Sequence, residues 1–334
     1  MTKICDGRPF TLTEARDVGI SRRQLDELRL IAAVRPVVPG VYVDARVPDD
    51  LGTRALALAR VLPSDAVICR RTAAWLYGVD AREPGRHRQV PELDVAVPAG
   101  RSPIRRAGVH GVVETLRAGD VDIVAGVPVT TPLRTAVDLA RWLPRRSAMA
   151  CVDALMHLDL VDKLALMEEL ERFAGFAYIE QARDIAYLAE PKTASFGESW
   201  LRLRIVDSGF PRFEPQIEIR DVDGVLVFLI DLGVRAKKKG VEYDGEEHHS
   251  AAADVAHDES RRTRLDREFG WEVIGFGRDA VLGRGLHLEE SVATLLGMAP
   301  QRRAIPIQPP APDDWDFTGE RSWPGSRQRR TAIA

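Results

Sequence analysis

The stretch PQIEIRDVDGVLVFLIDLGVRAKKKGVEYD, residues 215–244, decides the fold of the C-terminal part of this chain. Its apolar residues fall in three short segments typical of β-strands, and Asp223-Gly224 between the first two is a turn signal. An amphipathic helix beginning at Ser195 precedes these strands, and an arginine-bearing helix follows them. The segment WEVIGFG (271–277) supplies a last strand. The predicted order α-β-β-β-α-β makes a compact α/β domain.

Three acidic residues lie at informative places in this domain. Asp231 interrupts an apolar strand and Glu242 lies in the next strand, where a buried charge is unfavourable unless a cation or donors compensate it. Glu198 lies in the first turn of the preceding helix. Carboxylates from adjacent strands suit Mg²⁺, or Mn²⁺, which activates water and neutralises a phosphodiester's charge. The pattern predicts a metal site at Asp231 and Glu242, although Glu198 can instead form a capping box with Ser195.

Residues 195–280 resemble the very-short-patch-repair endonuclease-like family, a branch of the PD-(D/E)XK, or restriction-endonuclease-like, nucleases. The matching signature is ES in the first helix, a strand ending in ID, and VEYDGEEHH followed by the arginine-bearing helix and a GW-V-F strand. The resemblance implies a central mixed sheet and a Mg²⁺-dependent endonuclease. It also implies metal binding by Asp231 and Glu242 with support from Glu198.

The chain departs from the nuclease pattern two residues after the second acid, where Asp244 replaces the usual lysine. The resemblance gives His248 or His249 a role in proton transfer, and Asp244 or these histidines can substitute for the lysine. Asp244, with Glu198, Asp231, Glu242 and His249, therefore completes the predicted catalytic set. The alternatives are a plain turn at Asp244-Gly245 and an exposed loop at the two histidines.

The basic side chains of this domain each have two interpretations. The run KKK at 237–239 either contacts phosphate or is a solvated turn. The arginines of the following helix either track phosphates or form a salt-bridged exposed face, because acidic residues are interleaved with them. They are Arg261, Arg262, Arg264 and Arg267.

The stretch TLTEARDVGISRRQLDELRLIAAVRPVVPGVYVD, residues 11–44, predicts two short helices and a hairpin. Thr13 and Ser21 are expected to cap the helices, and Gly19 to end the first. In such a helix-turn-helix the second helix usually enters the DNA major groove, where arginine pairs with guanine, glutamine with adenine and serine with phosphate. Its first residues are Ser21, Arg22, Arg23 and Gln24. An ordinary helical hairpin with solvated arginines is the alternative.

Residues 8–45, followed by DAVICRRTAAWLYGV (65–79), look like the N-terminal winged helix of AbiEi-type antitoxins of bacterial toxin–antitoxin systems. The resemblance continues over 91–185, where ELDVAVPAG, GVPVTTPLRTAVDLAR and ACVDALMHLDLV match the body of those proteins. It implies DNA binding by Arg22, Arg23 and Gln24, helped by Arg70 and Arg71, and a cognate toxin as partner. A solvated helix start is the alternative for Arg70 and Arg71.

The segment PVTTPLRTAVDLARWL in the middle of the chain predicts a helix with little chemistry of its own. Thr131 is a good N-cap and Pro132 suits the first helical position. Arg134 and Asp138 are four residues apart, so we expect them to pair on the surface.

The composition of the chain is that of a globular protein: among 334 residues, 47 basic and 50 acidic side chains give a net charge of −3. Basic residues are in excess over 1–90 and 301–334, and acidic ones over 91–190 and 191–300. Cys5, Cys69 and Cys151 are widely spaced, which predicts buried free thiols rather than disulfides or a zinc site. No window is apolar enough to span a membrane, so we expect a cytoplasmic protein without membrane contact.

The sequence as a whole predicts an α/β (α+β multidomain) chain. We expect a winged helix over 1–90, a middle α/β domain over 91–190, a restriction-endonuclease-like domain over 191–300 and a disordered tail over 301–334. The leading hypothesis is a DNA-binding protein with a metal-dependent endodeoxyribonuclease domain, acting in defence, repair or a toxin–antitoxin system. The alternatives are a non-catalytic antitoxin-like repressor with a degenerate nuclease fold, and an RNA-processing nuclease.

Overall fold

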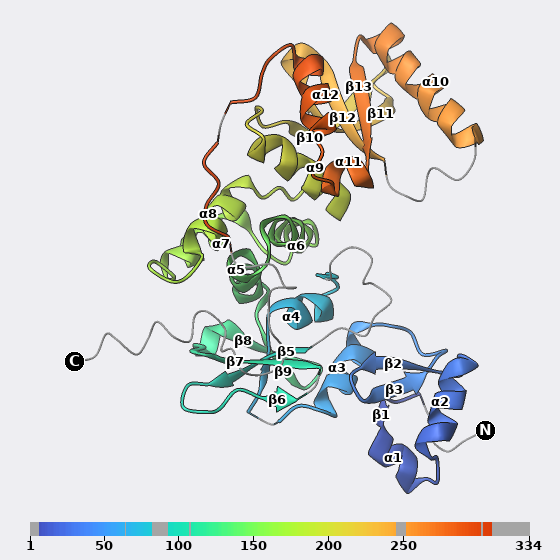
Figure 1. Ribbon diagram of the computed structural model, residues 1–334, viewed down its shortest axis with the longest axis vertical. Helices are drawn as coiled ribbons and strands as arrows, with labels where there is room; N and C mark the ends of the chain where they lie inside the picture. The colour runs from blue at the N-terminus through green and yellow to red at the C-terminus, as the bar shows by residue number, and fades with distance from the viewer. Residues whose placement is uncertain are drawn as a thin grey trace. The chain divides into compact units, whose positions relative to one another are not determined.

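The protein combines helices with mixed β-sheets, as expected for an α/β multidomain chain (Figure 1). The computed structural model describes residues 7–63, 65–81, 93–106, 108–244, 252–301 and 303–308. These residues form two compact units, a first unit up to Leu139 and a second unit from Ala140 onward. The domain boundaries predicted at residues 90, 190 and 300 stay predictions. Within the described ranges, no helix is long and apolar enough to cross a membrane.

The first unit begins with two helices and a small antiparallel sheet. Its elements are β1 (Phe10–Thr11), α1 (Leu12–Asp17), α2 (Arg22–Leu30), β2 (Val34–Val38) and β3 (Val41–Asp44). The strand order is β1-β3-β2, so β1 pairs with the second strand of the hairpin. The two helices and the hairpin predicted for residues 11–44 are therefore present.

The cap of α1 differs from the prediction. Thr11, not Thr13, is the N-cap, because Thr11 has an extended backbone and forms a capping box with Glu14. Thr13 is followed at the same spacing by Arg16, which cannot accept a hydrogen bond from a backbone N–H. Gly19 follows the helix with φ +85°, a left-handed conformation that glycine adopts without strain.

A larger mixed sheet fills the rest of the first unit. Its strands are β4 (Val67–Ile68), β5 (Leu93–Pro98), β6 (Arg105–Arg106), β7 (Val109–Glu114), β8 (Val121–Val124) and β9 (Val127–Thr130), in the order β6-β7-β5-β4-β9-β8. The helices of this part are α3 (Leu51–Ala59), α4 (Arg70–Leu76) and the short η1 (Ala118–Asp120). Leu58, Trp75, Val95 and Val129 share one buried core with the hairpin residue Val41.

The helix α5 (Pro132–Trp142) begins where the sequence predicts, since the Thr131 hydroxyl accepts a hydrogen bond from the N–H of Arg134 at 3.2 Å. The second unit continues with α6 (Arg145–His157), α7 (Lys163–Glu171) and α8 (Ile179–Leu188). Cys69 and Cys151 are buried free thiols, as predicted, while Cys5 lies outside the described residues.

The C-terminal part of the second unit has the predicted order α-β-β-β-α-β. It contains α9 (Phe196–Asp207), β10 (Glu214–Arg220), β11 (Leu226–Val234), η2 (Arg235–Lys237), β12 (Lys239–Asp244), α10 (Ala252–Phe269), β13 (Glu272–Gly277), α11 (Arg278–Leu282) and α12 (His287–Leu296). The strand order is β10-β11-β12-β13, with β12 and β13 parallel and the other pairs antiparallel.

Two apolar clusters hold this sheet between its helices. Leu201 and Ile205 of α9 pack with Leu232 and Val241, whereas Leu265 of α10 packs against the other cluster. A buried ion pair also fixes α9, because Arg202 donates to Asp153 of α6 at 2.5 Å. The sheet and α9 together position the acidic residues that the sequence singled out.

Candidate nucleic-acid interface and carboxylate cluster

The start of α2 is exposed, as a DNA contact requires. Leu25 is buried with the apolar residues of α1 and β1, so α2 turns its other face outward. Arg22 and Arg23 lie on that exposed surface, and the Arg23 side chain is 87% exposed with only a loose ion pair to Glu27 at 3.6 Å. Exposed arginines at a helix N-terminus are well placed to meet an anion.

Ser21 and Gln24 hold each other in a capping box at the same helix end. The Ser21 N–H and hydroxyl donate to Gln24 Oε1 at 2.9 and 2.8 Å, and the Gln24 N–H donates to Ser21 Oγ at 3.3 Å. Gln24 would have to leave this box to pair with a base edge. Its predicted contact with adenine therefore competes with the cap of α2.

The guanidinium groups of Arg70 and Arg71 form ion pairs within the first unit instead of lying on an open surface. Arg70 is 4% exposed and donates to Glu114 at 2.8 Å, from a backbone with φ +51°. Arg71 donates twice to Asp94, at 2.8 and 3.0 Å, and His110 contacts the same carboxylate at 2.9 Å. Neither the predicted DNA contact nor a solvated helix start describes this arrangement, because carboxylates far along the chain engage both guanidinium groups.

Asp94 is the buried member of this group. Burial disfavours its charge, but Arg71 and His110 outweigh that effect and hold the pKa of Asp94 well below its usual range. The backbone N–H of Asp94 is itself satisfied by the Thr72 hydroxyl at 2.7 Å. The carboxylate is therefore stabilised in its ionised form as part of the fold.

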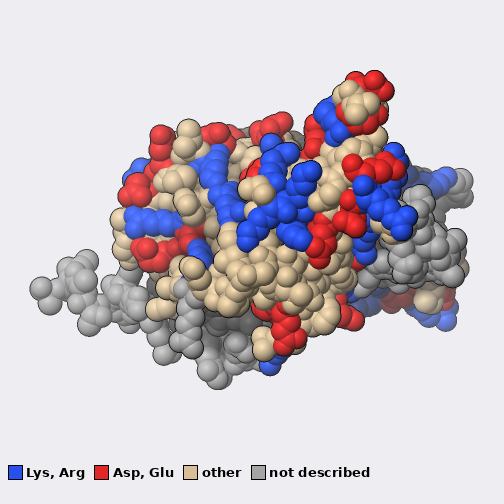
Figure 2. Space-filling view, turned by 90° about the horizontal axis from the view of Figure 1, so that it is seen from above, with Lys and Arg blue, Asp and Glu red and all other residues tan. Residues whose placement is uncertain are grey.

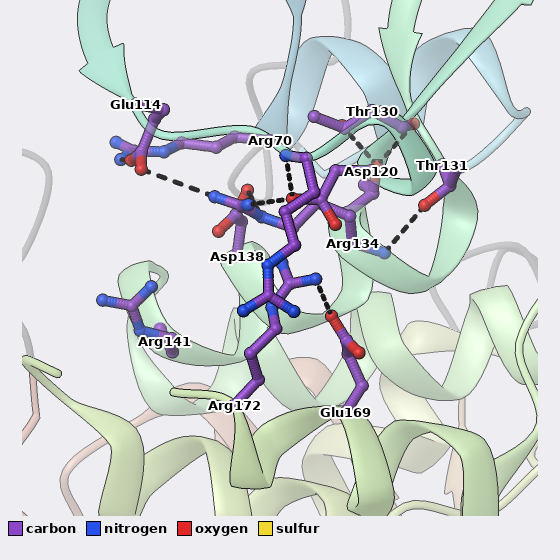
Figure 3. A network of polar contacts seen from close by, with 12 residues as sticks. Arg70, Glu114, Asp120, Thr130, Thr131, Arg134, Asp138, Arg141, Glu169 and Arg172 are labelled. Carbon is purple, nitrogen blue, oxygen red and sulfur yellow. Dashed lines mark hydrogen bonds and ion pairs between the residues drawn. The ribbon is translucent and has the colours of Figure 1, made fainter. Parts of the chain in front are cut away.

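A second buried network surrounds Arg134 (Figure 3). Its guanidinium donates to Asp138 and Asp120 at 3.0 Å each, and lies 3.4 Å from Glu114, which also accepts from Arg70. Arg134 and Asp138 do pair as predicted, but they are 2% and 1% exposed, so the expected surface position was wrong. Burial lowers the pKa of Arg134, and the surrounding carboxylates raise it by more.

The predicted carboxylates of the second unit lie close together. The ladder between β11 and β12 ends one residue short of Asp231, whose Oδ2 accepts a hydrogen bond from the Tyr243 N–H at 2.9 Å. Burial raises the pKa of Asp231 to about 7, and the charges of Glu198 and Glu242 add to this rise against the bond from Tyr243. Glu198 and Glu242 therefore both disfavour the ionised form of Asp231.

Glu198 is fixed from both sides of its carboxylate. Ser195 caps α9 by accepting from the Glu198 N–H at 3.2 Å, but the Glu198 side chain bonds the Ala194 N–H at 3.1 Å rather than closing the box on Ser195. Gln216 Nε2 donates to the same Glu198 oxygen at 2.9 Å. The alternative of a simple capping box is therefore only half correct.

Gln216 is a site residue that the sequence did not reveal. The register of β10 and β11 places it opposite Asp231, and its φ of +48° is unusual for a residue other than glycine. Backbone strain of this kind concentrates at functional sites. The only signal in the sequence is a polar residue between the apolar strand positions, which is too common to single out.

Glu242 is paired with an arginine of the following helix. Arg261 Nη1 donates to both Glu242 oxygens at 2.8 Å, and Arg262 donates to Asp244 at 2.9 and 3.0 Å. Gly275 of β13 leaves room for the second pair, because a Cβ there would meet Asp244 at 2.0 Å. Arg261 and Arg262 therefore face the strand acids, whereas the predicted exposed salt-bridged face holds for Arg264.

These residues have the right donor chemistry for a divalent cation but not the right arrangement. Carboxylate oxygens are ligands that Mg²⁺ and Mn²⁺ take. However, both oxygens of Glu242 already accept from Arg261, and across the described part of the chain no three His, Cys, Asp or Glu side chains are grouped to hold an ion. With Arg261 in this position, Asp231 and Glu242 do not fit a shared metal. His248 and His249 lie outside the described residues.

The KKK run begins in an exposed turn, as one of the two interpretations expected, and its lysines also bond to the fold. Lys237 and Lys238 donate to the carbonyls of Leu296 and Phe269, at the ends of α12 and α10, at 2.9 Å each. Lys239 pairs with Glu272.

Figure 2, seen from above Figure 1, shows basic side chains gathered near the middle of the face with acidic ones on both sides. The charges of this face are therefore mixed rather than uniformly basic.

The comparison with known proteins supports the predicted AbiEi resemblance for the middle of the chain. Residues 66–190 match the family described as the AbiEi antitoxin C-terminal domain. This range covers the body expected at 91–185 but reaches neither residues 8–45 nor 195–280. The resemblance to a winged helix and the resemblance to a nuclease thus stay predictions.

Two relatives extend the comparison over most of the chain. They are the uncharacterized proteins MT2308 and Rv2248 from two strains of Mycobacterium tuberculosis. Each is 30% identical over 256 residues, which is 76% of this chain and 89% of the relative. The chain belongs to the family of these mycobacterial proteins, with an AbiEi antitoxin-type segment in its middle.

Proposed function

We propose that the chain is a DNA-binding regulator of the antitoxin kind, in which the start of α2 contacts DNA. The observation that carries this proposal is the exposure of Arg22 and Arg23 at the capped start of a helix whose opposite face is buried. The AbiEi antitoxin match of residues 66–190 supports the toxin–antitoxin context.

The two arginines have separate uses in such a contact. An arginine that meets phosphate adds affinity for any sequence and makes binding depend on salt, whereas one that pairs with guanine adds specificity. The positive end of α2 favours phosphate near Ser21. Ser21 and Gln24 keep that end ordered, so their capping box prepares the helix for either use.

Fluorescence anisotropy with the DNA upstream of the chain's own gene tests the assignment. Replacing both Arg22 and Arg23 by Ala should weaken binding, and should reduce the slope of log affinity against log salt by about 1.8 if both meet phosphate. Arg29→Ala is the matched control, because Arg29 pairs with Asp26 at the other end of α2. Unchanged affinity and slope in the double variant would remove α2 from the interface.

The partner proposed with this function is a cognate toxin. An antitoxin-like chain should restore growth of cells that express the toxin encoded beside it. Co-expression of the full chain with the neighbouring gene product tests this, using the double Arg22 and Arg23 variant to separate DNA binding from rescue. Growth arrest by the neighbour that the chain does not relieve would contradict the proposal.

A second candidate function is metal-dependent phosphodiester hydrolysis by the C-terminal part. The specific observation in its favour is the cluster of Glu198, Asp231 and Glu242 beside the strained residue Gln216. Only with Arg261 away from Glu242 would Asp231 and Glu242 hold a divalent cation, which would offset the charge of the scissile phosphate and lower the pKa of a bound water so that it attacks as hydroxide. Asp244 is bonded to Arg262, so we assign it a positioning role.

Cleavage of plasmid DNA and of single-stranded RNA with Mg²⁺ or Mn²⁺ tests the second candidate and separates its two substrates. The wild type should cut one of them, and Asp231→Ala and Glu242→Ala should each abolish cutting. His249→Ala tests the predicted proton transfer. Equal cutting by wild type and Asp231→Ala would identify a contaminating nuclease.

A further inference from the structure

The counter-ion of Glu242 comes from the helix that follows the strand. The Glu242 side chain is 8% exposed, and Arg261 binds both of its oxygens through one nitrogen while the other nitrogen donates to the Leu229 carbonyl at 2.9 Å. The guanidinium also lies 5.7 Å from the centre of the Phe228 ring. Arg261 thus bridges β11 and β12 directly beside Asp231.

This position is the one that a divalent cation shared by Asp231 and Glu242 would need. A guanidinium and a metal ion cannot both bind the two Glu242 oxygens, because their positive charges repel and their contact atoms overlap. We infer that Arg261 is a built-in counter-ion that excludes divalent cations from the carboxylate cluster, and that the cluster binds a cation only when Arg261 leaves Glu242. The inference rests on the second candidate function.

The structure allows the arginine to leave without undocking its helix. Arg261 is 27% exposed at its side chain, so it can turn toward solvent. Its neighbour Arg262 is held by Asp244 at 2.9 Å and lies only 3.8 Å from Glu242, and Leu265 one turn later is fully buried. The exchange is therefore a movement of one side chain, unlike the fully enclosed Arg134 of the first unit.

Asp231 would give a divalent cation a second carboxylate. The register of β11 and β12, with Leu232 paired to Val241, places Asp231 opposite Glu242, so an ion between the two strands would balance both carboxylates at once. The same ion would meet the side-chain oxygen of Asp231 that does not accept from Tyr243. Arg261 neutralises one acid, whereas a divalent cation neutralises two.

Calorimetric titration of the full chain with Mn²⁺ alone tests this inference. Arg261→Met keeps the length of the side chain without its charge, and should bind Mn²⁺ at least about tenfold more tightly than the wild type, a change of about 1.4 kcal/mol. Arg264→Met is the matched control, because Arg264 lies on the same helix and pairs with Glu268 at 2.9 Å. Its Mn²⁺ affinity should equal that of the wild type.

A double variant and thermal unfolding complete the test. Adding Glu242→Gln to Arg261→Met should remove the gained affinity. Mn²⁺ should raise the Tm of Arg261→Met by more than it raises that of the wild type, and Arg261→Lys gives an intermediate result if the Met variant folds poorly without the ion. If the wild type and Arg261→Met bind Mn²⁺ equally, the idea that Arg261 excludes the ion is overturned, while the metal site itself is retained. If no variant binds Mn²⁺, both the exclusion by Arg261 and the metal site are overturned.

Discussion

The two buried charge clusters of this protein differ in how their carboxylates are balanced. Around Arg134, three carboxylates surround one guanidinium, and Arg70 binds one of them from the other side (Figure 3). Around Asp231, burial and the charges of Glu198 and Glu242 oppose its ionisation, while Arg261 binds Glu242. The first arrangement stabilises the ionised acids, whereas the second leaves one acid with a raised pKa.

This difference separates a structural network from a candidate site. Buried charges that a fold uses for itself are paired and hydrogen-bonded, because an unbalanced one is costly. An acid kept in an unfavourable environment is a pattern that functional sites show. Positive φ does not separate the two clusters, because Arg70 of the first and Gln216 of the second both have it. The contrast in charge balance supports a functional site at the carboxylate cluster, and the variants described below test it.

The largest effect is expected from Arg134→Met. This change leaves Asp138 and Asp120 charged and buried without their shared cation, so the free energy of unfolding should fall by about 3–5 kcal/mol in urea denaturation. Arg101→Met is the control, since Arg101 is 64% exposed in its ion pair with Asp65 and its loss should cost under about 1 kcal/mol. Equal costs for the two variants would show that the network is not what stabilises this unit.

Asp94→Asn should cause a smaller loss of stability, and this loss should depend on pH. The pKa of Asp94 is held below its ordinary value of 3.8, so its ionised form favours folding above that pH and the contribution disappears as the pH falls through the lower folded value. The variant should lose about 2–3 kcal/mol of unfolding free energy at pH 7 and progressively less below pH 4. A loss of stability that does not change with pH would contradict this origin.

Asp231→Asn should change the free energy of unfolding in the opposite direction. The folded pKa of about 7 lies above the ordinary value of 3.8, so ionisation of Asp231 opposes folding as the pH rises between these two values. With EDTA present, the variant should gain about 2 kcal/mol relative to the wild type by pH 8 and almost nothing at pH 4. Asn still accepts from the Tyr243 N–H, so a net loss at pH 8 would argue against an unbalanced carboxylate.

The sequence predicted features that depend on neighbouring residues. The order α-β-β-β-α-β follows from alternating apolar residues and turns, and the caps at Ser21 and Thr131 follow from side chains that bond three residues ahead. The acids Asp231 and Glu242 were found because charge is rare inside apolar strands. The residues that make up each of these signals lie within about one helix turn or one strand of each other.

Features that depend on distant residues were missed. For Arg70 the sequence predicted a DNA contact or a solvated helix start, but its partner Glu114 lies 44 residues later. For Arg261 it predicted a phosphate contact or an exposed salt-bridged face, but its partner Glu242 belongs to a strand 19 residues earlier. The buried position of Arg134 likewise depends on Asp120 and Glu114, which lie 14 and 20 residues earlier. Composition and spacing cannot show which charges the fold brings together.

The smallest effect concerns the strain at Gln216. Gln216→Ala loses the bond to Glu198 and keeps a side chain at φ +48°, whereas Gln216→Gly loses the same bond but relieves the positive φ. The Gly variant should therefore be about 1 kcal/mol more stable than the Ala variant in urea denaturation. Comparing the two variants cancels the lost hydrogen bond and isolates the backbone strain. If the Ala variant is as stable as the Gly variant, the positive φ of Gln216 stores no strain, and only the raised pKa of Asp231 sets the carboxylate cluster apart from the network around Arg134, where Arg70 also has a positive φ.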